Sequence, residues 1–77
     1  MSNAGEIIKH VRTRSGLTQK QLAKRAGLSS SHVVKYLEDG TRSPSMDVFI
    51  RIIQVCDFEI VVKPKYREGT HYENKER

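Results

Sequence analysis

Three histidines and one cysteine are the side chains of this sequence whose chemistry could serve catalysis or metal binding. His10, His32 and His71 lie in different segments, with no cysteine or acidic residue at a matching spacing. Cys56 is the only cysteine, which excludes a disulfide framework, a thiolate zinc site and a CxxC redox pair. No glycine-rich phosphate loop is present. We therefore predict no catalytic residue, no metal site, no cofactor and no enzymatic activity, and we expect Cys56 to be a small core residue.

Hydrogen-bonding and cationic side chains offer a different chemistry, the binding of a polyanion. The chain carries a formal net charge of +5, which suits DNA, RNA or an anionic membrane surface. Aromatic platforms for stacking RNA bases are absent, and the bulky apolar residues are needed for a core, not for lipid. The composition and its distribution therefore favour double-stranded DNA over RNA or a membrane.

The length of 77 residues predicts a single domain, and a domain this small is only marginally stable alone. Only 36% of the residues are hydrophobic, so support from a partner subunit is plausible. No run of about eighteen apolar residues and no signal-peptide pattern occurs. We therefore expect no membrane association and a cytoplasmic location.

Capping residues and glycines mark four helices. Asn3 with Glu6 and Thr18 with Gln21 form capping-box patterns at the starts of the first two helices. Ser29 and Ser45 are suitable N-caps for the third and fourth helices. The expected helices are 4–15, 19–26, 30–38 and one following Ser45, with Gly16 and Gly27 ending the first two.

The apolar residues in these helices recur at helical spacing and predict the core. The expected core residues are Ile7, Ile8, Val11, Leu22, Ala23, Ala26, Leu28, Val33, Tyr36, Leu37, Val48, Phe49, Ile52 and Ile53. Ala23 must be small because the third helix crosses close above it. Gly27 should adopt a positive φ in the turn between the second and third helices.

The second and third helices, joined through Leu22-Ala23-x-x-x-Gly27-Leu28, form a helix-turn-helix pattern. The segment 17–44, LTQKQLAKRAGLSSSHVVKYLEDGTRSP, resembles the lambda-repressor/Cro-like (XRE) family, and the resemblance extends from about Ile7 to Ile53. It implies an all-α helix-turn-helix domain of four to five short helices and a sequence-specific transcriptional regulator that binds DNA.

The resemblance also implies which residues contact DNA. The start of the second helix should face a phosphate, which its free N–H groups and positive dipole end favour. The third helix should enter the major groove with its first residues against the bases. The predicted DNA-binding residues are Gln19, Lys20, Ser29, Ser30, Ser31, His32 and Lys35, with Thr41, Arg42 and Ser43 on the loop beside the backbone.

The end of the third helix departs from the family pattern. The family usually places a glutamate directly after the residue that aligns with Tyr36, whereas here Leu37 intervenes before Glu38. We interpret this as a one-residue insertion and leave the register of these three residues open. The family often pairs the equivalents of Arg12 and Glu38 between the first and third helices, and the resemblance implies such a pair here.

After the helices the apolar residues recur at every second position. Phe58, Ile60 and Val62 alternate with Glu59, Val61 and Lys63, and the run stops at Pro64, which predicts one short strand. A lone strand has unpaired backbone groups, and the same strand of a second copy would pair them across a two-fold axis. We therefore predict a homodimer whose interface includes Phe58, Ile60, Val61 and Val62.

The predicted organisation is a DNA-binding domain over 1–57, a dimerisation strand over 58–64 and a disordered tail over 65–77. Some XRE antitoxins of toxin–antitoxin operons are similar, with four or five helices and a C-terminal strand. Two readings stay open. One is a dimeric repressor of its own operon, with or without a second role as an antitoxin; the other is a phage or plasmid regulator or an interaction module without a toxin.

Overall fold

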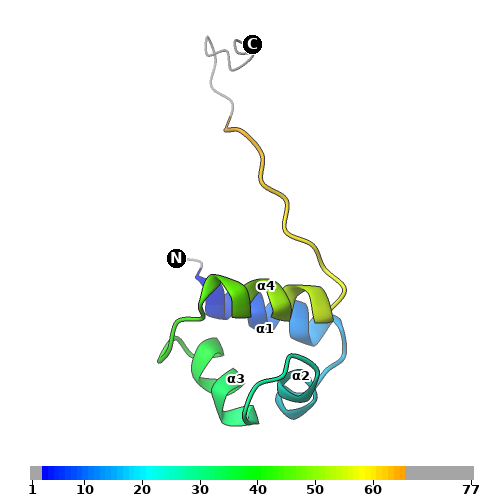
Figure 1. Cartoon of the computed structure of the whole chain (residues 1–77), viewed down its shortest axis with the longest axis vertical. Helices are drawn as coiled ribbons and strands as arrows, with labels where there is room; N and C mark the ends of the chain where they lie inside the picture. The colour runs from blue at the N-terminus through cyan, green and yellow to red at the C-terminus, as the bar shows by residue number, and fades with distance from the viewer. Residues whose placement is uncertain (1–2, 66–77) are drawn as a thin grey trace.

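Four helices form the folded part of the chain, for which the computed structural model describes residues 3–65. They are α1 (Ala4–Arg14), α2 (Gln19–Arg25), α3 (Ser31–Glu38) and α4 (Met46–Val55). In Figure 1, α1 and α4 lie side by side on one side of the domain, with α2 and α3 on the other. All four predicted helices are confirmed, with small differences at their ends.

The helix starts follow from capping side chains. The Asn3 side chain accepts a hydrogen bond from the Glu6 N–H at 3.0 Å. Both bonds of the predicted capping box join Thr18 and Gln21, at 2.9 and 3.0 Å. The prediction for α3 was wrong by one residue: Ser30, not Ser29, is the N-cap, and its hydroxyl accepts the His32 N–H at 3.2 Å. Three consecutive serines offer three possible caps, so composition alone could not select one.

The core lies between the two pairs of helices. Its buried residues are Ile8, Val11, Leu17, Leu22, Ala23, Ala26, Val34, Leu37, Ile52, Ile53 and Cys56. The predicted core is thus correct for most positions, but α3 is rotated relative to expectation. Val34 is fully buried, Val33 is only half-buried, and Tyr36 is 37% exposed. Ile7, expected in the core, is also exposed at 41%.

Two glycines allow backbone geometry that a larger residue would not. Gly27, in the turn before α3, has a φ of 72°, as predicted. Gly5 lies where the start of α1 meets the end of α3: a Cβ there would clash with the Leu37 carbonyl oxygen and lie 2.8 Å from that of Glu38. Sequence analysis missed this close approach, because nothing local marks a glycine as a helix-crossing point.

The C-terminal segment, residues 58–65, leaves the domain at the end of α4 (Figure 1). The Phe58 N–H donates to the Ile53 carbonyl at 3.0 Å, and the Phe58 ring packs edge-on against His10 at a centroid distance of 6.4 Å. From Glu59 to Pro64 the structure shows no hydrogen bond. The strand predicted over 58–64 is therefore not present in the described residues, since a strand needs a second segment to pair with. The tail predicted to be disordered lies outside the described residues from position 66 onward.

Candidate nucleic-acid interface

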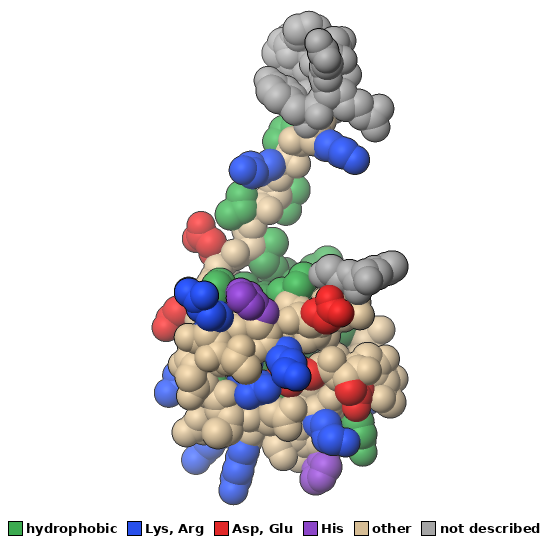
Figure 2. All heavy atoms as spheres, turned by 180° about the vertical axis from the view of Figure 1, so that it is seen from behind, with side chains coloured by type: hydrophobic (Ala, Val, Ile, Leu, Met, Phe, Trp, Pro, Cys, Tyr) green, Lys and Arg blue, Asp and Glu red, His purple; other side chains and the backbone are tan. Residues whose placement is uncertain are grey.

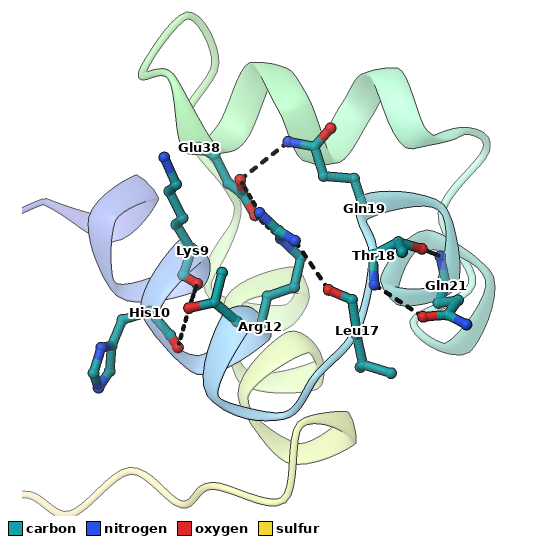
Figure 3. A network of polar contacts seen from close by, with 9 residues as sticks. Lys9, His10, Arg12, Leu17, Thr18, Gln19, Gln21 and Glu38 are labelled. Carbon is teal, nitrogen blue, oxygen red and sulfur yellow. Dashed lines mark hydrogen bonds and ion pairs between the residues drawn. The ribbon is translucent and has the colours of Figure 1, made fainter.

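A polar network fixes α2 and α3 relative to α1 (Figure 3). The Arg12 guanidinium forms two bonds to the Glu38 carboxylate, Nε to Oε2 at 2.5 Å and Nη2 to Oε1 at 3.0 Å. Its Nη1 donates to the Leu17 carbonyl at 2.9 Å. The Gln19 amide donates to Glu38 Oε1 at 3.1 Å. One carboxylate therefore joins the end of α3 to both α1 and the first residue of α2.

This ion pair is largely removed from solvent, with side-chain exposures of 13% for Arg12 and 5% for Glu38. A bidentate arginine–carboxylate pair also fixes the relative orientation of its two partners. The pairing implied by the family resemblance is confirmed. Removal of either partner would leave the other charge largely buried and unpaired, so the pair stabilises the packing of α1 against α3.

The same contacts settle the register at the end of α3. Leu37 is buried in the core, and Glu38 is the residue that pairs with Arg12. The helix continues without interruption from Ser31 to Glu38. These contacts fix the register that the sequence left open, while the one-residue insertion stays an interpretation. The placement of Tyr36 in the core was wrong, because Val34 and Leu37 occupy that position.

The start of α2 carries Gln19 and Lys20. Gln19 is half-buried, and its amide is engaged with Glu38, so the side chain is held in place by the protein itself. An amide nitrogen carries two N–H groups, and the bond to Glu38 uses one of them. Lys20 is exposed. This helix end can therefore offer a positioned amide N–H, an exposed cation and free backbone N–H groups to an anion.

The start of α3 holds the remaining polar residues that sequence analysis grouped there. Ser29, Ser30, His32 and Lys35 are exposed, and Ser31 is half-buried. A groove between α2 and the start of α3 is lined by Lys20, Lys24, Ser29, Ser30, Ser31 and His32, with Ala23 and Leu28 at its apolar base. The structure thus gathers the predicted residues Lys20, Ser29, Ser30, Ser31 and His32 along one groove, which Gln19 and Lys35 do not line. It adds Lys24, which sequence analysis did not select.

The loop between α3 and α4 is ordered by its own hydrogen bonds. The Asp39 carboxylate accepts the Thr41 N–H at 2.8 Å. Hydrogen bonding from the Thr41 side chain and then from its backbone N–H lowers the pKa of Asp39. The Arg42 N–H donates to the Tyr36 carbonyl at 3.1 Å. Thr41, Arg42 and Ser43 all remain exposed on this loop. They lie beside the last turn of α3, not in the groove at its start.

Two further residues contribute in ways that sequence analysis missed. Arg51 of α4 donates from Nη1 to the Ala26 carbonyl at 3.2 Å, which satisfies the C-terminal end of α2. Tyr36 presents its ring on the surface of α3, with the Lys35 ammonium 5.8 Å from the ring centroid. Sequence analysis placed Tyr36 in the core because the residue belongs to an apolar pattern at helical spacing. The Arg51 contact depends on tertiary packing alone.

The charges around these helices suit a polyanion. Figure 2 shows Lys and Arg side chains at the end of the helical domain opposite the C-terminal segment, and hydrophobic side chains where that segment leaves the domain. Among residues 3–65, no three His, Cys, Asp or Glu side chains are grouped to hold a metal ion. Within the same residues, no helix is long and apolar enough to cross a membrane. The arrangement can donate hydrogen bonds and neutralise negative charge.

Comparison with known proteins agrees with this geometry. The model of a helix-turn-helix family matches residues 8–62, from the second turn of α1 into the C-terminal segment. A search of the curated proteins found no match to the chain. The family match covers every helix described above except the first turn of α1.

Proposed function

The chain belongs to the lambda-repressor/Cro-like (XRE) helix-turn-helix family, a class of DNA-binding transcription regulators and not of enzymes, and from this we propose that it is a sequence-specific repressor. The observation that supports this most directly is the groove between α2 and α3, lined by lysines, serines and a histidine. These groups donate hydrogen bonds and carry positive charge, as a DNA surface requires.

We place α3 in the major groove with its first turns against the base edges. Ser30, Ser31 and His32 would then meet base edges, and Lys35 would bond the O6/N7 edge of a guanine. Ser29, just before the helix, would lie at the edge of the same contact. The exposure of Ser29, Ser30, His32 and Lys35 supports this placement, as does the groove that Ser29, Ser30, Ser31 and His32 line together. Serines donate to or accept from several bases, so they discriminate weakly on their own.

Phosphate contacts would fix the position of the domain on the duplex. Gln19 and Lys20 at the start of α2 would meet one phosphate, where the helix dipole favours an anion. The bond from Gln19 to Glu38 supports this role because it orients the amide before DNA arrives. Thr41, Arg42 and Ser43 would meet the backbone at the other end of α3. Such contacts provide affinity without sequence preference.

We also propose that the protein acts as a homodimer on an inverted-repeat operator. Phe58, Ile60, Val61 and Val62 are exposed by 38%, 45%, 63% and 90%. Ile60 and Val62 line an apolar groove with Met46, Ile50 and Ile53 of α4. Antiparallel pairing of residues 58–62 with a second copy would satisfy the backbone of this segment and cover the groove. A two-fold axis would set the two α3 helices about 34 Å apart, one turn of DNA, or a multiple of it.

Residues 1–57 would then form the DNA-binding domain and residues 58–64 the dimerisation strand. The same exposed apolar segment keeps an antitoxin role open, because a toxin could cover part of it. A regulator without a toxin partner is the alternative. The gene beside the coding sequence distinguishes them: a toxin kinase or ribonuclease there would support the antitoxin role.

Alanine variants test the assignment of roles. Lys35→Ala and Ser31→Ala should weaken binding to the preferred operator more than to random duplex, by roughly 1–3 kcal/mol for a strong base contact. Arg42→Ala and Lys20→Ala should weaken both duplexes about equally. Binding is measured by fluorescence anisotropy at one fixed salt concentration. If Lys35→Ala leaves the operator preference intact, its role in base recognition is wrong.

A further inference from the structure

Tyr36 is an aromatic residue on the outer surface of α3. Val34, two positions before it, is fully buried and Leu37, directly after it, is 4% exposed, whereas Tyr36 is 37% exposed. His32 precedes it by four residues, so the two side chains lie one above the other on the same helix face. Tyr36 therefore extends the face that carries His32 by one full turn.

The surroundings of Tyr36 are polar and cationic. The Lys35 ammonium is 5.8 Å from the centre of the ring. The Tyr36 carbonyl accepts the Arg42 N–H, so the loop with Thr41 to Ser43 begins beside this turn. Among residues 3–65 the phenol hydroxyl has no hydrogen-bond partner. A half-exposed ring that neither fills the core nor bonds through its hydroxyl is free to meet a ligand.

The exposed position of Tyr36 and its cationic neighbours together suit contact with the surface of duplex DNA. The side chains at the start of α3 are serines and a histidine, which can contact bases through hydrogen bonds. None of them provides a flat apolar surface. The major groove contains one apolar group that distinguishes bases, the C5-methyl of thymine, and proteins recognise it by apolar contact. The Tyr36 ring is the group on α3 that can make this contact.

We propose that Tyr36 is a specificity-determining residue that recognises a thymine methyl group in each half of the operator. This inference rests on the proposed function and adds a residue and a base preference to it. The ring packs against the methyl, and Lys35, held beside the ring, lies toward the adjacent base or phosphate. The apolar contact would provide the discrimination that the serines lack.

The experiment first selects the preferred duplex from random DNA with the parental protein. Each thymine of the selected site is then replaced, one at a time, by deoxyuridine, which lacks only the methyl group. We expect one position in each half-site where this change weakens binding about fourfold, the effect of removing one buried methyl group from an apolar contact. Replacement of thymines elsewhere in the site should leave the affinity unchanged.

Two variants identify the side chain responsible. Tyr36→Phe keeps the ring and should retain the fourfold sensitivity at that position. Tyr36→Ala removes the ring and should bind the thymine and deoxyuridine duplexes equally. Circular dichroism checks that both variants keep the parental helicity and Tm, as expected for an exposed side chain.

Three results would overturn the inference. They are a parental protein insensitive to every deoxyuridine, a Tyr36→Ala variant with the parental sensitivity, or a Tyr36→Phe variant that behaves like Tyr36→Ala. The last would assign recognition to the hydroxyl instead of the ring. Failure of the proposed function is distinct, because the parental protein would then select no sequence at all.

Discussion

The helical domain and the segment after it differ in how far their backbone polar groups are hydrogen-bonded and their apolar side chains buried. In the domain, side-chain caps complete all four helix starts, and a buried ion pair joins α1 to α3. In the segment, residues 59–64 make no hydrogen bond among the described residues, and Val62 is 90% exposed. One region is complete within a single chain, and the other, over residues 59–64, leaves its backbone groups unpaired and its apolar side chains exposed.

Under the proposed function, this difference separates two tasks on DNA. The domain holds α3 at a fixed angle to α2, so that its surface residues are presented as one rigid unit. The segment would determine how two such units are spaced. Changes in the domain should therefore alter stability, and changes in the segment should alter assembly. The predictions below test that division.

The largest effect is expected at Glu38. Glu38→Ala leaves the Arg12 guanidinium without its carboxylate, and breaking a buried ion pair in this way costs about 3–5 kcal/mol. Glu59→Ala, in the exposed segment, is the matched control and should leave the free energy of unfolding unchanged. Urea denaturation followed by circular dichroism measures both. Equal losses in the two variants would contradict the division between domain and segment.

A second effect is expected at Ile60, in assembly instead of stability. Ile60→Pro removes one backbone N–H from each of two paired strands, worth about 2 kcal/mol in total at roughly 1 kcal/mol per bond. Dimer dissociation should therefore rise about thirtyfold, while helicity is kept. Ile60→Val keeps the N–H and the branched side chain and serves as the control. Sedimentation at micromolar concentration measures the oligomeric state of the parent and both variants. A monomeric parent, or an Ile60→Pro variant that is fully dimeric, would contradict an interface at residues 58–62.

A third, smaller effect is expected at Gly27, where φ is 72°. Valine at this backbone conformation costs roughly 1–2 kcal/mol, whereas asparagine is tolerated more readily. Gly27→Val should therefore lower both the Tm and DNA affinity, and Gly27→Asn should lower them less. Neither change should affect the dimer. A valine variant that melts like the parent would show that the turn does not require a left-handed residue.

The smallest effect concerns Cys56, at the end of the domain. Burial raises the pKa of its thiol. A raised folded-state pKa means that its contribution to stability is fully present below the pKa of an unfolded cysteine, about 8.5, and is lost as the pH rises through the folded value. The Tm difference between parent and Cys56→Ala should therefore shrink above about pH 8.5. A difference that is constant from pH 7 to 10 would contradict the raised pKa.

Sequence alone predicted the parts of the fold that local chemistry determines. Capping pairs such as Thr18 with Gln21 act over three residues, and Gly27 marks a turn through its own backbone. The helices and the turn were therefore predicted correctly. The ion pair of Arg12 with Glu38 was expected from the family resemblance, since its partners are 26 residues apart.

The errors occurred where tertiary packing decides. Val33, Val34 and Tyr36 all suit an apolar stripe, and only the crossing of α3 over the core selects Val34. Three consecutive serines are all suitable N-caps, and Ser30 is the cap because α3 begins at Ser31. The close approach at Gly5 and the contact of Arg51 with the end of α2 have no local signal at all. The alternating pattern of 58–62 predicts a strand, but a strand depends on a partner outside its own sequence.

The most direct test of the central claim is a titration of duplex DNA at several salt concentrations. The DNA is the duplex upstream of the coding sequence, with a random duplex beside it. A dimer that contacts roughly 6–10 phosphates should lose about 10³–10⁵ in affinity between 50 and 200 mM salt, with the upstream duplex bound more tightly throughout. No binding at low salt, or an affinity that does not change with salt, would contradict a DNA-binding function for this protein.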